Sequence, residues 1–430
     1  MNAKPETAPY RAAFAPAGTL AEKRREAFAR FEKLGFPTRR EEAWRFTNLR
    51  LLQAEVFLPH PKPLKPAQRE GEGAISPYFL AGDTHRIVLV NGRFAPALSK
   101  IGSLPKGATL GSAAEIAAKQ PALAERLLDQ TDIAGGQAFA SLNAALFADG
   151  FVLVLDPGAV LERPVEIIHW SDAAESAFHL RNLIQLGGGS RATIVETYAG
   201  NGRYWTNAVA LADLAVGAAL RHVKLQDEAT GAIHFGQVRA SIARDARYES
   251  FVLTLGGRLS RHDSLATFAG EGAACGLFGA YLLKGEQEAT NATFVDHAVP
   301  KCATSEVFKG VVDERAHGVF LGKIAVRPQA QKTDAHQLNK NLLLSPRANV
   351  DTKPELEILA DDVKCSHGAT VGDLDENALF YLAARGIPAD EARRMLIEAF
   401  AADAIDQIED DVAVRAHLSK HVQRWLGRKD

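Results

Sequence analysis

With 430 residues, 47% of them hydrophobic and 24% charged, the chain can bury a large core and form more than one structural unit. Its 50 basic and 52 acidic residues nearly cancel and form no dense run of either sign, which argues against a nucleic-acid-binding or anionic-membrane-binding surface. No stretch approaches the roughly 18 apolar residues of a membrane span. The N-terminus lacks the pattern of a secretory signal. The three cysteines, Cys275, Cys302 and Cys365, are too far apart in the sequence to suggest a disulfide framework. We therefore expect a cytoplasmic protein with reduced thiols.

Residues 1–75 are predicted to form a helical region that ends in a proline-rich linker. The segment 19–35 is rich in alanine and charged residues, as a helix is, and Gly35 can end it. A second helical piece is expected over 41–52. The segment 59–66 contains four prolines, which exclude a helix or a central strand because proline lacks the backbone donor and fixes φ. It is predicted to be a stiff extended linker.

Residues 76–149 are predicted to be a mixed lead-in of strand and helix. The run 86–90 is mostly aliphatic, and the following Asn91-Gly92 is typical of a hairpin turn, so a strand is expected to run into a tight turn there. Residues 111–131 return to a helical composition.

From 150 to 372 the chain changes to short strands separated by Gly, Pro and Asp. Four strand-like segments begin at 191, 218, 246 and 273, so their starts are almost evenly spaced. A fixed period of roughly this length is typical of stacked repeats. Since no period has room for a helix, the pattern predicts a parallel β-helix, in which each coil pairs its backbone with the next. A β-sandwich is the competing fold, because it also has regularly spaced short strands.

Residues 373–430 are predicted to be helical. Asp375 can cap a short helix that ends at Gly386, and the near-continuous apolar run inside it predicts burial on several sides. Two further helices, the first opening at Pro388, each carry an apolar stripe: Ile397, Phe400, Ala401, Ala404, Ile405 and Ile408 on one, and Val414, Leu418, Val422, Trp425 and Leu426 on the other. We expect the stripes to pack on each other and on the core; the alternative is a face left for a partner.

Several enzyme classes lack their sequence signatures. There is no GxxxxGK[ST] of a P-loop ATPase, no CxxC and no HExxH, and the glycines at 187–189 precede a strand rather than the helix of a dinucleotide loop. A β-helix carbohydrate enzyme is disfavoured because aromatic residues make up only 7% and no export signal is seen. His417 and His421 have a metal-chelating i, i+4 spacing, but both are expected to be solvated.

Cys365 and His367 are the leading candidates for a site. Residues i and i+2 of a strand point to the same side, so a thiolate and an imidazole could meet one ligand there, and this pair suits iron or zinc. Two ligands do not close a tetrahedral site, so the others must come from elsewhere in this chain or from a second chain. The alternative is that Cys365 is a small apolar side chain that only fills space, and that His367 is a residue capping a turn.

The remaining thiols and one further histidine are weaker candidates. Cys275 is expected to be a small buried side chain, whereas Cys302 is expected to be more exposed. His297, next to Asp296, could titrate or bind a metal, but a loop histidine paired with its surroundings is the simpler account.

Residues 339–358 (NKNLLLSPRANVDTKPELEI), 364–372 (KCSHGATVG) and 379–387 (LFYLAARGI) together resemble the SufB/SufD family of iron–sulfur cluster assembly proteins. Residues 38–49 (TRREEAWRFTNL) look like the SufD branch in particular. The lack of a cysteine cluster near the N-terminus also favours that branch.

The resemblance implies a mainly β fold, with a right-handed parallel β-helix between N-terminal and C-terminal α-helical regions. It implies a non-catalytic scaffold, paired through its β-helix with a SufB-like subunit, and with a SufC-like ABC ATPase docked on the C-terminal helices. The alternative is a self-sufficient SufB-type or homodimeric scaffold. No nucleic-acid or membrane partner is expected.

The resemblance also implies roles for the two candidate residues. The nascent cluster is expected to form where the two scaffold chains meet. His367 matches the family's motif histidine and is expected to be a metal ligand shared with the partner. Cys365 matches the motif cysteine, with a ligand, steric or redox role. No tightly bound cofactor is implied, only a transient iron–sulfur cluster or iron at the interface.

Overall fold

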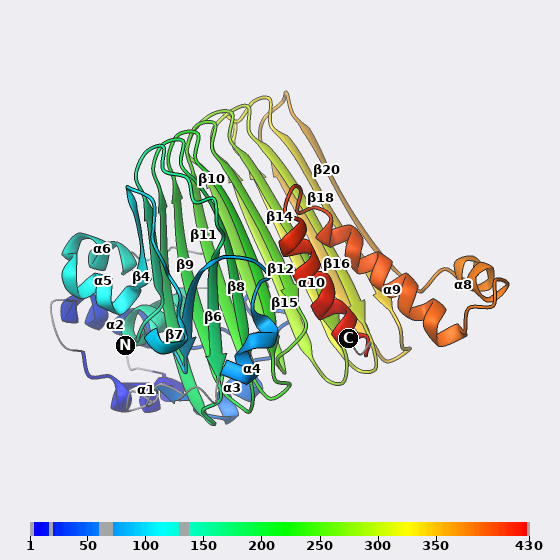
Figure 1. Cartoon of the computed structure of the whole chain (residues 1–430), viewed down its shortest axis with the longest axis horizontal. Helices are drawn as coiled ribbons and strands as arrows, with labels where there is room; N and C mark the ends of the chain where they lie inside the picture. The colour runs from blue at the N-terminus through cyan, green and yellow to red at the C-terminus, as the bar shows by residue number, and fades with distance from the viewer. Residues whose placement is uncertain (1–3, 17–19, 60–71, 129–136, 428–430) are drawn as a thin grey trace.

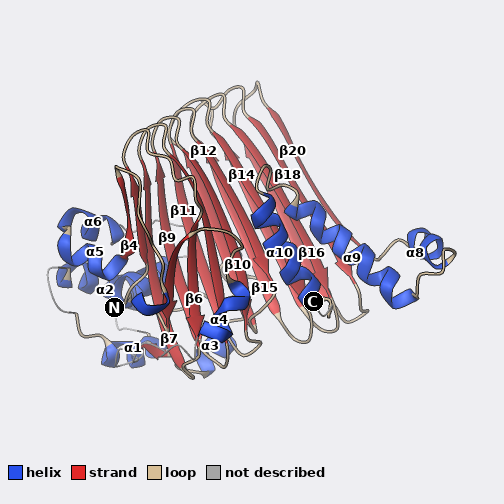
Figure 2. Cartoon of the chain, viewed as in Figure 1, coloured by secondary structure: helices blue, strands red, loops and turns tan. Residues whose placement is uncertain are grey.

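Two ten-stranded sheets form the centre of the molecule, and the chain alternates between them (Figures 1 and 2). The computed structural model describes residues 4–16, 20–59, 72–128 and 137–427. Sheet A has the order β19-β17-β15-β13-β11-β9-β7-β5-β4, with β1 beside β7, and sheet B has the order β20-β18-β16-β14-β12-β10-β8-β6-β2-β3. Each coil thus places one strand in each sheet, and eight such pairs follow one another from β5/β6 to β19/β20. The predicted parallel β-helix is confirmed, and the β-sandwich alternative is wrong.

The strands of sheet A are β1 (Leu58–Pro59), β4 (Ala108–Ser112), β5 (Phe151–Leu155), β7 (Ser176–Leu186), β9 (Trp205–Leu214), β11 (Ile233–Ile242), β13 (Leu259–Phe268), β15 (Glu288–His297), β17 (His317–Val326) and β19 (Asn349–Ile358). Those of sheet B are β2 (His85–Val90), β3 (Arg93–Phe94), β6 (Val165–Ser171), β8 (Arg191–Gly200), β10 (Ala219–Glu228), β12 (Arg247–Thr254), β14 (Ala274–Leu283), β16 (Ala303–Val312), β18 (Asp334–Leu343) and β20 (Lys364–Gly372).

The helical elements are η1 (Pro5–Thr7), α1 (Ala8–Ala13), α2 (Ala21–Leu34), η2 (Glu42–Trp44), α3 (Arg50–Ala54), α4 (Glu72–Ile75), η4 (Ser76–Tyr78), η5 (Pro96–Leu98), α5 (Ala113–Lys119), α6 (Pro121–Leu127), α7 (Gln137–Leu146), α8 (Glu376–Ala383), α9 (Ala389–Ile405) and α10 (Val412–Trp425). No described helix has the length and apolar character needed to cross a membrane.

The strand register shows how closely the coils follow the predicted period. Ala219 pairs with Arg191 and with Arg247, and Arg247 pairs with Ala274, so these early coils keep the predicted spacing almost unchanged. From 274 the next partners along sheet B are 303, 334 and 364, so each of these late coils is longer than the early ones. Because β14, β16 and β18 all have ten residues, the additional residues lie between the strands.

The space enclosed between the two sheets is here called the lumen. Alternate residues of each strand point into it, and the largest core cluster takes its members from both sheets, for example Ile194 and Leu220 from sheet B and Ala208 and Val238 from sheet A. At the N-terminal end the lumen is closed by the segment 94–110, whose Phe94, Ile101 and Leu104 pack against that core. At the other end β19 and β20 are the last strands of their sheets. This open end of the lumen is called the mouth.

The N-terminal helices cover the outer face of sheet A. Aromatic side chains dominate this contact, with Trp44 and Phe139 packed on Trp205 and Phe235 of the sheet. Helix α2 ends as predicted, with Gly35 at φ 65°. The hairpin turn predicted after β2 is also present.

Two N-terminal predictions need comment. A single helix over 41–52 is wrong: Arg261 of sheet A donates to the carbonyl of Ala43 at 2.8 Å and Trp44 is buried, so the chain makes only the short η2 and α3. Most of the proline-rich segment predicted to be a linker lies outside the described residues, and its first residue, Pro59, pairs in β1 with β7.

The C-terminal helices behave in two ways. The apolar stripes of α9 and α10 pack on the outer face of sheet B, as expected, with Ile405 and Leu418 almost fully buried. The predicted burial of α8 is wrong: none of its residues is buried, and Phe380 and Tyr381 are 76% and 55% exposed. Figure 1 shows the reason, because α8 projects beyond the end of the β-helix, where no sheet lies beneath it.

Candidate functional site

Cys365 and His367 lie at the mouth, on β20. Their register partners on the preceding coil are Ala335 and Gln337, both buried in the lumen. Parallel strands in register point equivalent side chains to the same face, so Cys365 and His367 also face the lumen. Cys365 is half-buried against the core cluster, whereas His367 is exposed because no further coil covers it.

The thiol of Cys365 is not activated by its surroundings. Burial and the neighbouring Asp334 carboxylate raise its pKa. The reactive and metal-binding form of cysteine is the thiolate, so at neutral pH Cys365 stays protonated until a cation approaches. Among the described residues no group of three or more His, Cys, Asp and Glu side chains could hold a metal ion. Cys365 and His367 therefore have no third ligand in that part of the chain.

Two buried side chains behind His367 were not singled out from the sequence. Glu306 aligns with Gln337, and Gln337 with His367, in successive coils. Gln337 Nε2 donates to Glu306 Oε2 at 2.7 Å. Burial raises the pKa of Glu306 to about 7, although hydrogen bonds from Gln337 and Thr293 oppose the shift. A polar row therefore leads from the lumen to the mouth.

A second set of ionisable side chains is buried deeper in the lumen. His222 Nε2 lies 2.6 Å from Glu196 Oε1, and His234 Nδ1 lies 2.8 Å from Glu228 Oε2. Burial opposes ionisation of both carboxyls, but the adjacent histidines lower their pKa values. Each carboxyl group lies against a histidine of its own, and the set lies on β8, β10 and β11, several strands from β20. We interpret it as a buried polar part of the core whose groups interact with one another.

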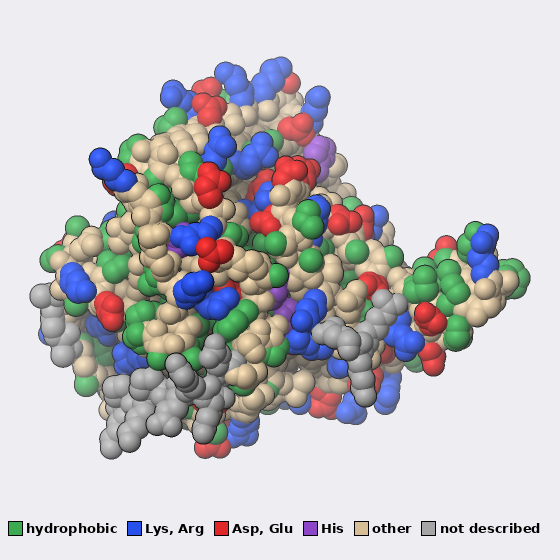
Figure 3. Space-filling view, viewed as in Figure 1, with side chains coloured by type: hydrophobic (Ala, Val, Ile, Leu, Met, Phe, Trp, Pro, Cys, Tyr) green, Lys and Arg blue, Asp and Glu red, His purple; other side chains and the backbone are tan. Residues whose placement is uncertain are grey.

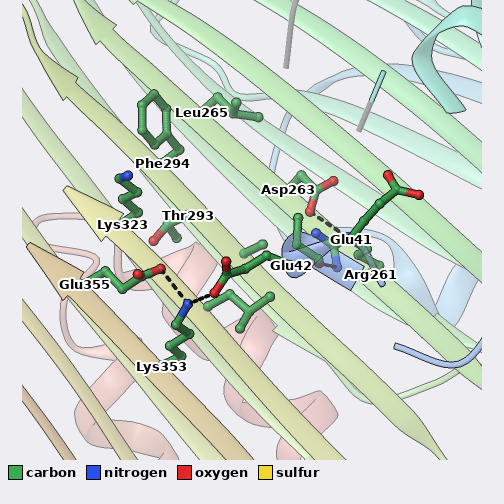
Figure 4. Close-up of a pocket in the computed structure, with 14 residues that line it drawn as sticks. Glu41, Glu42, Arg261, Asp263, Leu265, Thr293, Phe294, Lys323, Lys353 and Glu355 are labelled. Atoms are coloured by element: carbon green, nitrogen blue, oxygen red, sulfur yellow. Dashed lines mark hydrogen bonds and ion pairs between the residues drawn. The ribbon is translucent and has the colours of Figure 1, made fainter. Parts of the chain in front are cut away.

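A groove of about 530 Å³ lies on the outer face of sheet A, beside η2 (Figure 4). Leu265, Phe294 and Leu321 are among its apolar lining. Figure 4 shows Lys353 between Glu42 and Glu355, and both carboxylates are its ion-pair partners. The cations of this groove already have carboxylate partners, so its charges do not single out a ligand class.

The other cysteines and His297 are all buried. Cys275 is 3% exposed, which confirms its expected role as a small core side chain. The expectation of a more exposed Cys302 is wrong, since it is 1% exposed and its Sγ donates to the carbonyls of Gly270 and Pro300 at 3.5 Å. His297 belongs to β15 rather than to a loop. It is fully buried, and its Nε2 lies 2.8 Å from Thr304 Oγ1.

The expectation that His417 and His421 are solvated is wrong. They are 7% and 1% exposed, because the face of α10 that carries them packs against the body of the protein. The ring of Tyr78 stacks on His421 with centroids 5.2 Å apart, and His421 Nδ1 lies 3.4 Å from Asp227 Oδ2. Burial lowers the pKa of His417 to about 3. Their i, i+4 spacing reflects helix packing.

Comparison with known proteins places this architecture in a family. The family model for the SufBD core domain of SUF-system FeS cluster assembly matches residues 169–400, and the model for the SufBD N-terminal region matches residues 14–167.

Relatives cover nearly the whole chain. An iron–sulfur cluster assembly SufBD family protein of Synechocystis sp. is 33% identical, over 90% of this chain and 87% of its own length. The iron–sulfur cluster assembly protein SufD of Escherichia coli is 31% identical, over 92% and 90%. Protein ABCI7, chloroplastic, of Arabidopsis thaliana is 30% identical, over 91% and 83%. The chain therefore belongs to the SufBD family of SUF-system iron–sulfur cluster assembly proteins, on its SufD side.

Proposed function

We propose that the chain is a non-catalytic scaffold subunit that helps to build a nascent iron–sulfur cluster at a junction with a SufB-like subunit. The observation that carries this proposal is the position of His367. It faces the lumen from the last coil, beside the thiol of Cys365, where the lumen opens to solvent. In this proposal His367 is a ligand of the iron or cluster, which is cargo rather than a resident cofactor, and the partner chain supplies the missing ligands.

The mouth also offers the means of pairing. Among the described strands, β19 and β20 each have a neighbour on one side only, so their outer backbone groups are available to a strand of another chain. Charged side chains such as Lys353, Glu355 and Lys364 line these strands, as is typical of edges that must not pair indiscriminately. A SufB-like β-helix joined here would bring its own side chains next to His367.

The C-terminal helices support the proposed contact with a SufC-like ABC ATPase. Of the ten exposed large hydrophobic side chains in the described part of the chain, three lie on α8 and α9: Phe380, Tyr381 and Met395. Figure 3 shows hydrophobic side chains on the projecting end that carries α8. Apolar side chains gathered in this way mark protein contacts.

The remaining surface favours no other partner class. Figure 3 shows acidic and basic side chains interspersed on the face in view, and the totals of the two signs in the sequence nearly cancel. We propose a cytoplasmic protein with no tightly bound cofactor and no nucleic-acid or membrane partner.

Replacement of His367 by Ala tests the ligand role. The matched control is His336→Ala, an exposed histidine on the neighbouring strand whose side chain faces outward to Ser366 at 2.6 Å. With the complex intact, His367→Ala is expected to lower the activity of iron–sulfur enzymes in the cell, whereas His336→Ala is not. Unchanged maturation in His367→Ala would show that the ligand assignment is wrong.

Purification of the tagged chain from its own cells tests the partners. Recovery of both a SufB-like chain and the ATPase supports the proposed complex. Recovery of the chain with itself alone supports instead the homodimeric scaffold.

A further inference from the structure

His367 is the last member of a row of side chains that runs along the lumen, one residue per coil. The register aligns Leu277 with Glu306, Glu306 with Gln337, and Gln337 with His367. Neighbouring strands lie about 4.8 Å apart, so each side chain of the row stands beside the next. The row is apolar at Leu277 and polar from Glu306 to the mouth.

The side chain of Gln337 is held in one orientation inside the lumen. Its Nε2 donates to Glu306 Oε2 at 2.7 Å, and the same oxygen accepts a 2.9 Å hydrogen bond from Thr293 Oγ1 of sheet A. On the facing sheet Gly322 leaves the space that the amide occupies, because a Cβ there would overlap Gln337 Nε2. Glu306 and Gln337 are 1% and 2% exposed, so this arrangement is shielded from water.

The side-chain carbonyl oxygen of Gln337, Oε1, has no hydrogen-bond partner among the described residues. Glu306 Oε2 acts as the acceptor in either protonation state, since a proton on this carboxyl can sit on the unpaired Oε1. With Oε2 as the shared acceptor of Thr293 and Gln337, Gln337 turns its NH₂ toward Glu306 and its carbonyl oxygen away from it. No hydrogen-bond donor among the described residues reaches this buried Oε1. Buried polar atoms are rarely left unpaired, and the next side chain in the row is that of His367.

We infer that Gln337 is a positioning residue for His367: when the exposed His367 side chain turns toward the lumen, Gln337 Oε1 accepts a hydrogen bond from one imidazole nitrogen, which leaves the other nitrogen to bind iron or a cluster at the mouth. Histidines that bind metals usually donate their second N–H to such an acceptor, which fixes the tautomer and the ring orientation. The inference rests on the proposed role of His367 as a ligand.

The experiment follows the tautomer of His367 in the full chain without partner or iron, by NMR of ¹⁵N-labelled histidine at a pH at which imidazole is neutral, with His367→Ala identifying its signals. An acceptor holds the proton on the imidazole nitrogen that faces it. Gln337→Met removes the acceptor and is therefore expected to change the tautomer ratio of His367 severalfold. Gln337→Glu keeps an acceptor oxygen, so it is expected to preserve the dominant tautomer.

Gln226→Met is the matched control. Gln226 is also buried in the lumen, its Nε2 donates to Glu228 Oε2 at 3.0 Å, and its Oε1 is likewise unpaired, but it lies on β10, five strands from β20. A tautomer ratio of His367 that changes in Gln337→Met and is preserved in Gln337→Glu and Gln226→Met supports the positioning role. A ratio unchanged by Gln337→Met, or changed equally by Gln226→Met, overturns it.

The NMR sample contains no iron, so its outcome is separate from the maturation assay of His367→Ala. If NMR shows that Gln337 orients His367 but His367→Ala leaves maturation unchanged, the proposed function is refuted and the hydrogen bond stands. If His367→Ala impairs maturation but Gln337→Met leaves the tautomer of His367 unchanged, only the inference is refuted.

Discussion

Buried carboxyl groups of the lumen fall into two kinds at the scale of single residues. Glu196 and Glu228 have histidine partners that lower their pKa values against the opposing effect of burial. Glu306 has neutral hydrogen-bond donors, Thr293 and Gln337, and burial raises its pKa to about 7. Ionisation of Glu306 is therefore unfavourable in the folded state, and its contribution to stability depends on pH.

In the wild type, the Glu306 carboxyl group is expected to lower the free energy of unfolding as the pH rises from about 4.5 to 7. Glu306→Gln is expected to abolish this decrease. The unfolded group releases its proton near its ordinary pKa of 4.5, whereas the folded group retains the proton up to about 7. The folded state therefore binds more protons in this window, so stability falls as pH rises, by about 3 kcal/mol for this group alone. Denaturant unfolding of both proteins at about pH 5 and about pH 8 measures the effect. If the free energies of unfolding of the wild type and of Glu306→Gln differ by the same amount at both pH values, the prediction is contradicted.

At the scale of elements, sequence composition alone does not distinguish the C-terminal helices that pack from the one that projects. The apolar residues of α9 and α10 form stripes that meet sheet B, whereas those of α8 have no sheet beneath them. Whether an apolar helix is buried depends on where the chain carries it. The local sequence of α8 correctly indicated a helix capped by Asp375, and the structure shows that cap.

A double substitution, Phe380→Ser with Tyr381→Ser, tests the use of α8. Both side chains are mostly exposed, so the free energy of unfolding is expected to change by less than about 1 kcal/mol. Recovery of the ATPase with the tagged chain is expected to fall strongly. Val412→Ser, an equally exposed apolar residue at the start of α10, is the control and should recover the ATPase as the wild type does. Undiminished recovery with the double variant would remove α8 from the proposed contact.

At the scale of the whole molecule, the β-helix is a stack in which each coil is stabilised by its neighbours. The first coils are closed off by the segment 94–110, and the middle coils have a neighbour on both sides. Strands β19 and β20 have one neighbour each. Local stability should therefore decrease toward the mouth, where the proposed assembly takes place.

Amide hydrogen exchange can measure this gradient. In the isolated chain, amides of β19 and β20 are expected to exchange faster than those of β11 and β13, because fewer contacts must break to expose them. A SufB-like subunit should slow exchange in β19 and β20 and leave β11 unchanged. If the exchange rates of β19 and β20 are the same with and without the SufB-like subunit, pairing through this end is contradicted.

The fold was largely predictable from the sequence, and the site only in part. A parallel coil pairs with its immediate neighbour, so the architecture appears in the sequence as a nearly fixed repeat. His367 and Cys365 were found because they share one short motif. Glu306 and Gln337 were missed because they lie two coils and one coil before His367, and these late coils are longer than the early repeat. Extending the early period would have pointed to the wrong residues; only the register of the late coils identifies them.

The closure of the lumen at one end has a consequence for stoichiometry. A stack with two open ends can add units at both and grow into a fibre, as heterologous contacts that do not close tend to do. Here the segment 94–110 blocks the first end, and a partner joined at the mouth uses up the second. If the second scaffold chain, a copy or a relative, is blocked at the same end, the proposed end-to-end joining stops at two chains, and each finished pair encloses a single junction.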